Sequence, residues 1–169
     1  MAVSALRAER HLLIEGPHGS GKSELVTEIC RRSGRTRTTV NGSLGLTAGA
    51  LVGHHDPAVL LRRGYTGESF VPGALVASMR DGAVLHLDEA NRLPPDGFNV
   101  LISAMSEGAV EVPRHGRVRA APGFVVIAAA NPLDGVGTAD LPAAFLDRVV
   151  RLSLHHQSAA EEQAIVRAH

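Results

Sequence analysis

The sequence predicts an α/β fold in which a parallel β-sheet lies between layers of helices. Two observations carry this prediction. Short apolar runs of strand length alternate along the chain with segments whose apolar residues recur at helical spacing, an order typical of parallel sheets covered on both faces. Polar residues follow several of these runs directly, as expected where parallel strands end together at one edge of a sheet.

Length and composition fit one globular domain. Of the 169 residues, 44% are hydrophobic and 20% are charged, so the chain can bury a substantial core. The 17 basic and 17 acidic residues cancel, which argues against electrostatic binding of nucleic acid as the main function. The longest apolar run, Phe124–Ala130, is far shorter than a membrane-spanning helix, and the N-terminus lacks a signal-peptide pattern, so we expect a cytoplasmic protein.

The first part of the chain is predicted to form a strand, a loop, a helix and a second strand. His11–Glu15 is a short apolar run that ends at a glycine-rich loop, and Lys22–Arg32 then has helical spacing until a glycine stops it. Thr36–Val40 is a second β-rich run, which ends at Asn41-Gly42. A long polar and glycine-bearing stretch follows.

Three more strands and two helices are expected in the second half. Ala83–Leu87 indicates a buried strand, and Leu93–Asp96 opens a helix that a glycine closes. The helix carries an apolar stripe at i, i+3, i+4 and i+7, which indicates core packing, made of Phe98, Leu101, Ile102 and Met105. Phe124–Ala130 and Val149–Leu154 are the last two strands, the latter after a short helix begun by Pro142.

The segment from Gly16 to Ser23 is a complete phosphate-binding motif. It reads Gly16-Pro17-His18-Gly19-Ser20-Gly21-Lys22-Ser23, matches GxxxxGK[ST], and stands between a predicted strand and a predicted helix. In such loops backbone N–H groups turn towards phosphates, the lysine reaches their oxygens and the serine ligates Mg²⁺. Lys22 is the only lysine beside 16 arginines, which suits a site that needs a compact charge. We interpret His18, at a variable position, as an exposed loop residue rather than a catalytic base.

Two acids follow the third predicted strand directly. Asp88 comes after a mostly apolar run, a position from which its carboxylate can hold the Mg²⁺ water shell beside the Ser23 hydroxyl. Glu89 comes next, and a second carboxylate there can polarise a water for in-line attack on a phosphate. The alternative is that Asp88-Glu89 only begins a polar loop. The phosphate-binding motif upstream favours the catalytic interpretation.

Asn131 and Arg148 are weaker candidates on the residues alone. Asn131 ends the most apolar strand, where its amide could hydrogen-bond a phosphate or the attacking water, although Asn before Pro132 is also a common turn pair. Arg148 stands just before the last strand and could be directed towards a neighbouring subunit's nucleotide. A cation at a helix end, favoured by the helix dipole, is the simpler interpretation of Arg148.

Together these segments resemble the core domain of an AAA+ ATPase, specifically the MoxR-like and dynein-related branch that includes the NorQ, CbbQ and GvpN proteins. The segments that carry the resemblance are Gly16–Ser23 as Walker A, Val84–Arg92 as Walker B, Ala128–Pro132 as sensor 1 and Gly137–Arg148 as the stretch with an arginine finger. The resemblance implies a P-loop NTPase with a five-stranded parallel sheet. It also implies that Asn131 is sensor 1 and that Arg148 acts in trans.

The same resemblance implies cofactors and partners. ATP and Mg²⁺ would be the ligands, and the chain would form a homo-oligomeric ring, a hexamer, with a chaperone-like or metal-loading role on a client and often a von Willebrand A-domain partner. Gly64–Gly73 resembles the family's insertion in helix 2, and Val110–Val118 resembles the hairpin before sensor 1. Arg114 and Arg117 in the second stretch, with Arg119 just after it, make this region basic, which fits contact with an acidic partner, but a solvated hairpin explains them at least as well.

The sequence departs from the family towards both ends. Family members continue past the last core strand into a helical lid that carries the sensor 2 arginine, whereas only the start of a lid, Ser158–Val166, is present here. The region before the first strand is also short. We therefore expect an AAA+ core over residues 1–154 and the start of a truncated lid or tail over residues 155–169, as in a fragment or a split gene product.

The sequence thus predicts Mg²⁺-dependent ATP hydrolysis by the residues named above. The chief alternative is a nucleotide-binding module without turnover, acting as a scaffold or a regulatory ring subunit. A phosphotransferase is disfavoured by Glu89, because a nucleotide kinase needs no water-activating acid there, and by the lack of an evident acceptor site. A DNA motor is disfavoured by the zero net charge.

Overall fold

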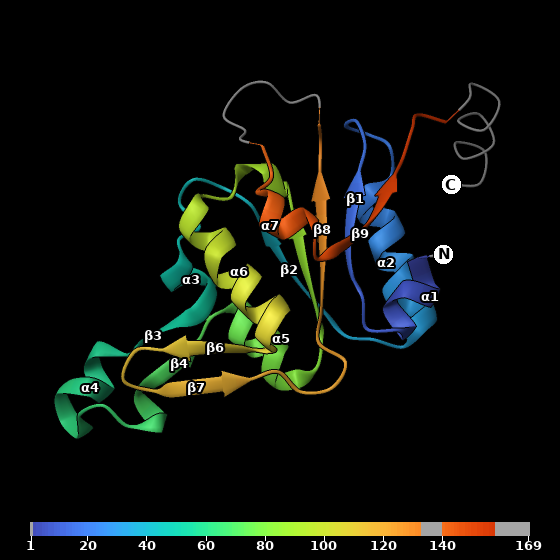
Figure 1. Ribbon diagram of the computed structural model, residues 1–169. Helices are drawn as coiled ribbons and strands as arrows, with labels where there is room; N and C mark the ends of the chain where they lie inside the picture. Colours follow the sequence, from blue (N-terminus) through green and yellow to red (C-terminus); the bar gives the residue numbers. More distant parts are fainter. Residues whose placement is uncertain (1, 133–139, 158–169) are drawn as a thin grey trace.

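A five-stranded parallel sheet forms the centre of the computed structural model, which describes residues 2–132 and 140–157 (Figure 1). Its strands lie in the order β2-β5-β8-β1-β9. They are β1 (His11–Glu15), β2 (Arg37–Asn41), β5 (Val84–Asp88), β8 (Val125–Ala130) and β9 (Val149–Ser153). Every neighbouring pair is parallel. The predicted fold class is confirmed, and each of these strands begins and ends within one residue of its predicted bounds.

Helices cover both faces of the sheet because the strands are apolar on both faces. One face, which includes Leu12, Ile14 and Ile127, packs against α1 (Ala2–Arg7) and α2 (Lys22–Ser33). The opposite face belongs to a core that also contains residues of four further helices, namely α3 (Ala48–Val52), α5 (Ala74–Asp81), α6 (Pro95–Glu107) and α7 (Ala143–Leu146). Figure 1 shows the two helical layers on either side of the sheet.

Glycines and prolines set the helix boundaries that the sequence indicated. Helix α2 ends at Gly34 and α6 ends at Gly108, both in the left-handed conformation. Pro95 occupies the first turn of α6, and Pro142 precedes α7. The predicted stripe of α6 does pack into the core: Phe98 and Leu101 are fully buried, and Ile102 and Met105 pack against the core while partly exposed.

The stretch between β2 and β5 holds more structure than its sequence indicated. Besides α3 and α5 it contains α4 (Pro57–Arg63), the 3₁₀ helix η1 (Gly67–Ser69) and an antiparallel pair formed by β3 (Gly53–His55) and β4 (Phe70–Pro72). Helix α5 buries Leu75, Val76 and Met79. These elements escaped prediction because they are short, and because β3 pairs with a strand that begins 15 residues after β3 ends.

A second hairpin is formed by β6 (Ala109–Val112) and β7 (Gly116–Arg119), as expected for the stretch around His115-Gly116. The two hairpins contact each other: the Phe70 ring stacks on His115 with centroids 4.3 Å apart, and the Arg114 guanidinium lies over Tyr65. Both hairpins lie beyond the amino ends of the central strands (Figure 1). They are therefore remote from the Gly16–Ser23 loop, which follows a strand's carboxyl end.

No helix in the described ranges is long and apolar enough to cross a membrane. The expected start of a lid, 158–166, and residues 137–139 of the stretch leading to Arg148 lie outside the described residues. The predicted division at residue 154 into core and tail therefore stays a prediction.

Candidate functional site

The Gly16–Ser23 loop joins β1 to α2, as predicted. Gly19 and Gly21 have φ angles of 76° and 81°, in the left-handed region that favours glycine. Gly16 is required for a different reason, because a Cβ there would lie 2.8 Å from Ser20 Oγ and 2.9 Å from the carbonyl oxygen of Leu154. No side chain of the described ranges caps α2 at Gly21, a helix start typical of anion-binding loops.

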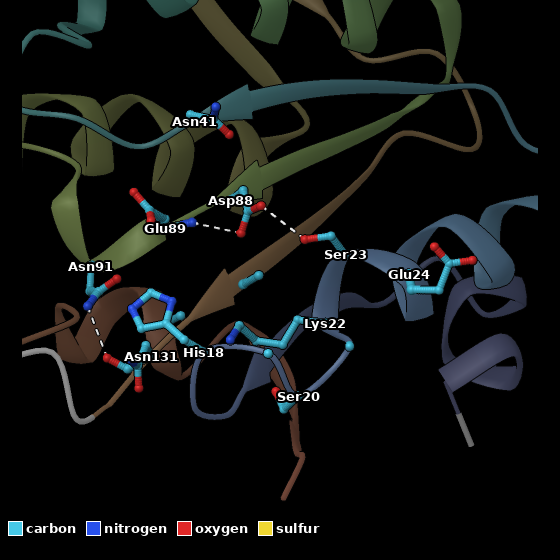
Figure 2. A pocket seen from close by; sticks show the side chains of 14 residues that line it. His18, Ser20, Lys22, Ser23, Glu24, Asn41, Asp88, Glu89, Asn91 and Asn131 are labelled. Carbon is cyan, nitrogen blue, oxygen red and sulfur yellow. Dashed lines mark hydrogen bonds between the residues drawn. The ribbon is translucent and has the colours of Figure 1, made fainter. Parts of the chain in front are cut away.

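The ammonium group of Lys22 lies across this loop. Its Nζ donates hydrogen bonds of 2.8 Å to the carbonyl oxygens of Gly16 and Pro17. The buried Ser20 hydroxyl donates to the same Pro17 carbonyl at 2.9 Å. The loop therefore holds the cation at the cavity that Figure 2 shows, where phosphate oxygens would meet it.

Ser23 and Asp88 form the candidate metal site. Ser23 Oγ donates to Asp88 Oδ2 at 3.1 Å, although 65 residues separate them in the chain. The other carboxylate oxygen, Oδ1, accepts the backbone N–H of Glu89 at 3.0 Å, which fixes the orientation of the carboxylate. A hydroxyl and a carboxylate oxygen are ligands that Mg²⁺ accepts, with water and substrate phosphates completing the octahedron. The donor set present in the chain therefore fits Mg²⁺.

Glu89 adopts an unusual backbone conformation at the end of β5. Its φ and ψ of 49° and 46° are left-handed, which is uncommon outside glycine and is often found at functional sites. Its carboxylate forms an ion pair with Arg92 Nε at 3.4 Å, in the 3₁₀ helix η2 (Ala90–Arg92), and both side chains are about two-fifths exposed. Gly42 packs against this turn: its N–H donates to the Asp88 carbonyl at 2.7 Å.

Asn131 follows β8 and is buried beside Asn91. Asn91 Nδ2 donates to the carbonyl oxygen of Asn131 at 3.1 Å. This hydrogen bond links the 3₁₀ helix that follows Glu89 to the residue that follows β8. Asn91 and Asn41 both line the cavity but were not among the predicted site residues. Asn41 could have been predicted from the sequence, because it is one more polar residue at the carboxyl end of a strand of the central sheet.

Most of the predicted residues converge on one cavity of about 510 Å³ at the carboxyl edge of the sheet. The predicted residues that line it are His18, Gly19, Ser20, Gly21, Lys22, Ser23, Asp88, Glu89 and Asn131. Gly16 and Pro17 do not line the cavity, but their carbonyl oxygens accept the hydrogen bonds from Lys22. In Figure 2 the loop and Lys22 form one side of the cavity, and Asp88 and Glu89 face them.

Arg148 does not line this cavity. It lies in the turn between α7 and β9, with a partly buried side chain. Its Nε donates to Ser106 Oγ of α6, and its Nη1 donates to the carbonyl oxygen of Ala144. Within one chain, therefore, Arg148 does not belong to the nucleotide pocket, and a role in catalysis requires a second subunit.

A buried histidine precedes the candidate metal site on the same strand. His86 lies two residues earlier on β5 and is 1% exposed, with Thr39 Oγ1 of the edge strand 3.4 Å from its Nδ1. Burial lowers the pKa of His86, and the nearby Asp88 carboxylate opposes that shift.

This fold and this cavity are those of a P-loop nucleotide-binding protein. Over residues 11–149 the chain matches the AAA domain family, dynein-related subfamily, and it belongs to that family. The predicted family and branch are confirmed. Membership implies nucleotide binding, as the Gly16–Ser23 motif indicated.

Similar proteins include two that are named gas vesicle ATPases. GvpN2 of Halobacterium salinarum is 32% identical over 97% of this chain and 52% of its own length, and GvpN of Haloferax mediterranei is 31% identical over 94% and 50%. The uncharacterized protein YojN of Bacillus subtilis is 34% identical over 88% of this chain and 49% of its own length. The chain therefore spans about half the length of the curated relatives it matches.

A solved structure shows the same fold. A crystal structure from Cytophaga hutchinsonii superposes with a TM-score of 0.75 over 98% of this chain and 47% of that one, at 21% sequence identity. At this identity the likeness supports the architecture alone.

Proposed function

We propose that this chain binds ATP with Mg²⁺ and hydrolyses it. The observation that carries the proposal is that residues predicted from three separate strand ends line one cavity of about 510 Å³. The hydrogen bond between Ser23 and Asp88 supports it further, because it joins the two expected metal ligands from the first turn of α2 and the end of β5.

In this proposal the chain's own residues position the phosphates, the metal and the water. The loop N–H groups and Lys22 bind the β- and γ-phosphates, and the Lys22 ammonium exchanges the two loop carbonyls for phosphate oxygens. Ser23 and Asp88 hold Mg²⁺, which when bound offsets charge on the phosphate oxygens. Glu89 orients and deprotonates the attacking water, and Asn131 contacts the γ-phosphate or that water.

Phosphate release from the purified chain tests the proposal. Glu89→Gln keeps the shape of the side chain but removes the base, so the rate is expected to fall by about 10²- to 10⁴-fold while nucleotide binding persists. The two proteins are compared over a range of protein concentrations, because assembly changes with concentration. The same rate for both at every concentration would refute hydrolysis by this site.

We also propose that the chain works in a homo-oligomeric ring in which Arg148 completes a neighbour's site. Its position in the turn after α7, where it is only partly buried, and its place outside the cavity support this role. An arginine finger contributes about 10³- to 10⁵-fold to the rate, so Arg148→Ala should be nearly inactive although its own pocket is intact. A hexameric ring, a chaperone-like or metal-loading role on a client, and a von Willebrand A-domain partner remain proposals from the family.

A second candidate, nucleotide binding without turnover, is favoured by the ion pair between Glu89 and Arg92. This pair engages the carboxylate that should face the water. However, a pair between partly exposed side chains contributes only about 0–1 kcal/mol, which lowers the population of available Glu89 by roughly fivefold at most. Hydrolysis therefore remains the preferred function. Nucleotide binding with no phosphate release from the wild-type chain would favour the second candidate.

A further inference from the structure

The side chain of Arg148 is anchored by a residue on another helix. Its Nε donates a hydrogen bond to the hydroxyl of Ser106, which lies in the last turn of α6 and 42 residues earlier in the sequence. Its Nη1 donates to the Ala144 carbonyl of α7. A partly exposed arginine without such contacts can adopt several rotamers, so hydrogen bonds from two of its nitrogens restrict the direction of its guanidinium.

The backbones under this contact are fixed by core packing. Phe145 of α7 is completely buried and packs edge-to-face against Phe98 of α6, with ring centroids 5.3 Å apart. Leu101, one turn further along α6, is also fully buried. The Phe98–Phe145 contact lies about two helical turns before Ser106 and fixes α6 relative to α7, so the Ser106 hydroxyl has a defined place relative to the arginine.

We infer that Ser106 is a positioning residue that directs the Arg148 guanidinium out of its own subunit and towards a neighbour's nucleotide. The inference rests on the proposed function, in which Arg148 acts in trans. The hydroxyl and the Ala144 carbonyl engage Nε and Nη1, and within the described ranges Nη2 has no hydrogen-bond partner. That amino group is thus available to a phosphate oxygen from outside the chain.

The expected effect of Ser106 is moderate, because it acts through Arg148. Loss of one hydrogen bond typically corresponds to a factor of about 2 to 12, so Ser106→Ala should lower turnover by about 3- to 10-fold, far less than Arg148→Ala. Ser106→Thr keeps the hydroxyl and should restore the rate. Ser103→Ala is the matched control: it lies one turn earlier on α6, and its hydroxyl donates to the Asn99 carbonyl of the same helix.

A mixing experiment separates positioning from folding. A Lys22→Ala subunit keeps Arg148 but loses phosphate binding, whereas an Arg148→Ala subunit keeps its own pocket, so their mixture should release phosphate that neither releases alone. Ser106→Ala placed in the Lys22→Ala subunit, which supplies Arg148, should lower the recovered rate 3- to 10-fold. The same substitution placed in the Arg148→Ala subunit should have no effect. Equal loss in both placements, or a loss matched by Ser103→Ala, would overturn the inference.

A second measurement tests the contact without ATP hydrolysis. In ¹⁵N NMR spectra of the nucleotide-free chain, solvent exchange of the Arg148 Nε–H should become several-fold faster in Ser106→Ala and stay unchanged in Ser106→Thr and Ser103→Ala. Unchanged exchange in Ser106→Ala would overturn the inference whatever the activity. If exchange responds as expected but the parental mixture releases no phosphate, the trans role of Arg148 fails and the positioning role of Ser106 fails with it, while the contact itself is confirmed.

Discussion

Gly42 is expected to be indispensable for the conformation of Glu89, although it would touch neither nucleotide nor metal. It follows β2 and lies against the turn in which Glu89 is left-handed. A Cβ on Gly42 would lie well inside 3.0 Å of the Glu89 carbonyl oxygen, a separation that real Cβ atoms essentially never show. The obstacle is backbone rather than a flexible side chain, so Gly42→Ala forces the two chain segments apart.

The size of the effect follows from that geometry. Ordinary van der Waals contact begins near 3.4 Å, so the Glu89 backbone must move by about 1 Å. Overpacking of this kind typically costs about 1–3 kcal/mol of stability. A displacement of about 1 Å in a group that positions the attacking water costs about 10²-fold in rate, or ~2.7 kcal/mol of barrier. Nucleotide affinity should change little, because the Gly16–Ser23 loop lies on the other side of the cavity (Figure 2).

The assay compares Gly42→Ala with Gly45→Ala, three residues along the same loop. A Cβ on Gly45 would lie 4.0 Å from the Ser43 hydroxyl, its nearest neighbour among the described residues, so this variant introduces a methyl group without a clash. Phosphate release, nucleotide affinity and the unfolding transition are measured for both. A Gly42→Ala protein that folds and releases phosphate as fast as Gly45→Ala would refute the argument that close backbone approach positions Glu89.

Two further predictions concern the stability of the folded protein. Phe145→Ala removes a completely buried ring from the α6–α7 contact and should lower the free energy of unfolding by about 3–5 kcal/mol, measured by urea denaturation. Burial lowers the pKa of His11, whose Nδ1 accepts the Val126 N–H at 3.0 Å. The neutral ring is thus the folded form, so its contribution to stability is complete above the ordinary pKa of 6.5 and is lost as the pH falls through the lower folded-state pKa. Urea denaturation between pH 8 and pH 5 should show this loss, and His11→Gln should reduce it; an unchanged pH dependence would contradict the assignment.

The grouping of the candidate site residues around one cavity was predictable because its signals are local in sequence. Each strand end carries its own polar residue, and in a parallel sheet all carboxyl ends meet at one edge, so Asp88 and Asn131 needed no knowledge of register to be placed near the loop. The role of Gly42, in contrast, could not be predicted from the sequence. Its importance depends on a close approach to Glu89, 47 residues away, and a glycine after a strand otherwise reads as an ordinary turn.

The hairpins show the opposite case, in which local signals fail. The β3–β4 pair has three residues in each strand, too few for alternation to distinguish strand from loop. Its order comes instead from contacts made in three dimensions, such as His55 Nδ1 with Ser69 Oγ at 2.8 Å and Phe70 with His115. Only the family resemblance identified Gly64–Gly73 as a structured insertion, because that resemblance compares whole stretches rather than single patterns.

Arg148 lies between these two cases and shows what a single chain can reveal about an assembly. The sequence places it before the last strand, and at that position a helix-end cation is the simpler interpretation. The structure adds that its guanidinium is held by Ser106 and Ala144 and lies outside its own cavity. A cation that only complements a helix dipole needs no anchor on a second helix, because dipole effects are weak and insensitive to direction within the last turn. A cation that must reach a particular oxygen does need one, since misplacement by about 1 Å can cost 10²-fold. The anchoring by Ser106 therefore favours the trans role, and the mixing experiment measures it.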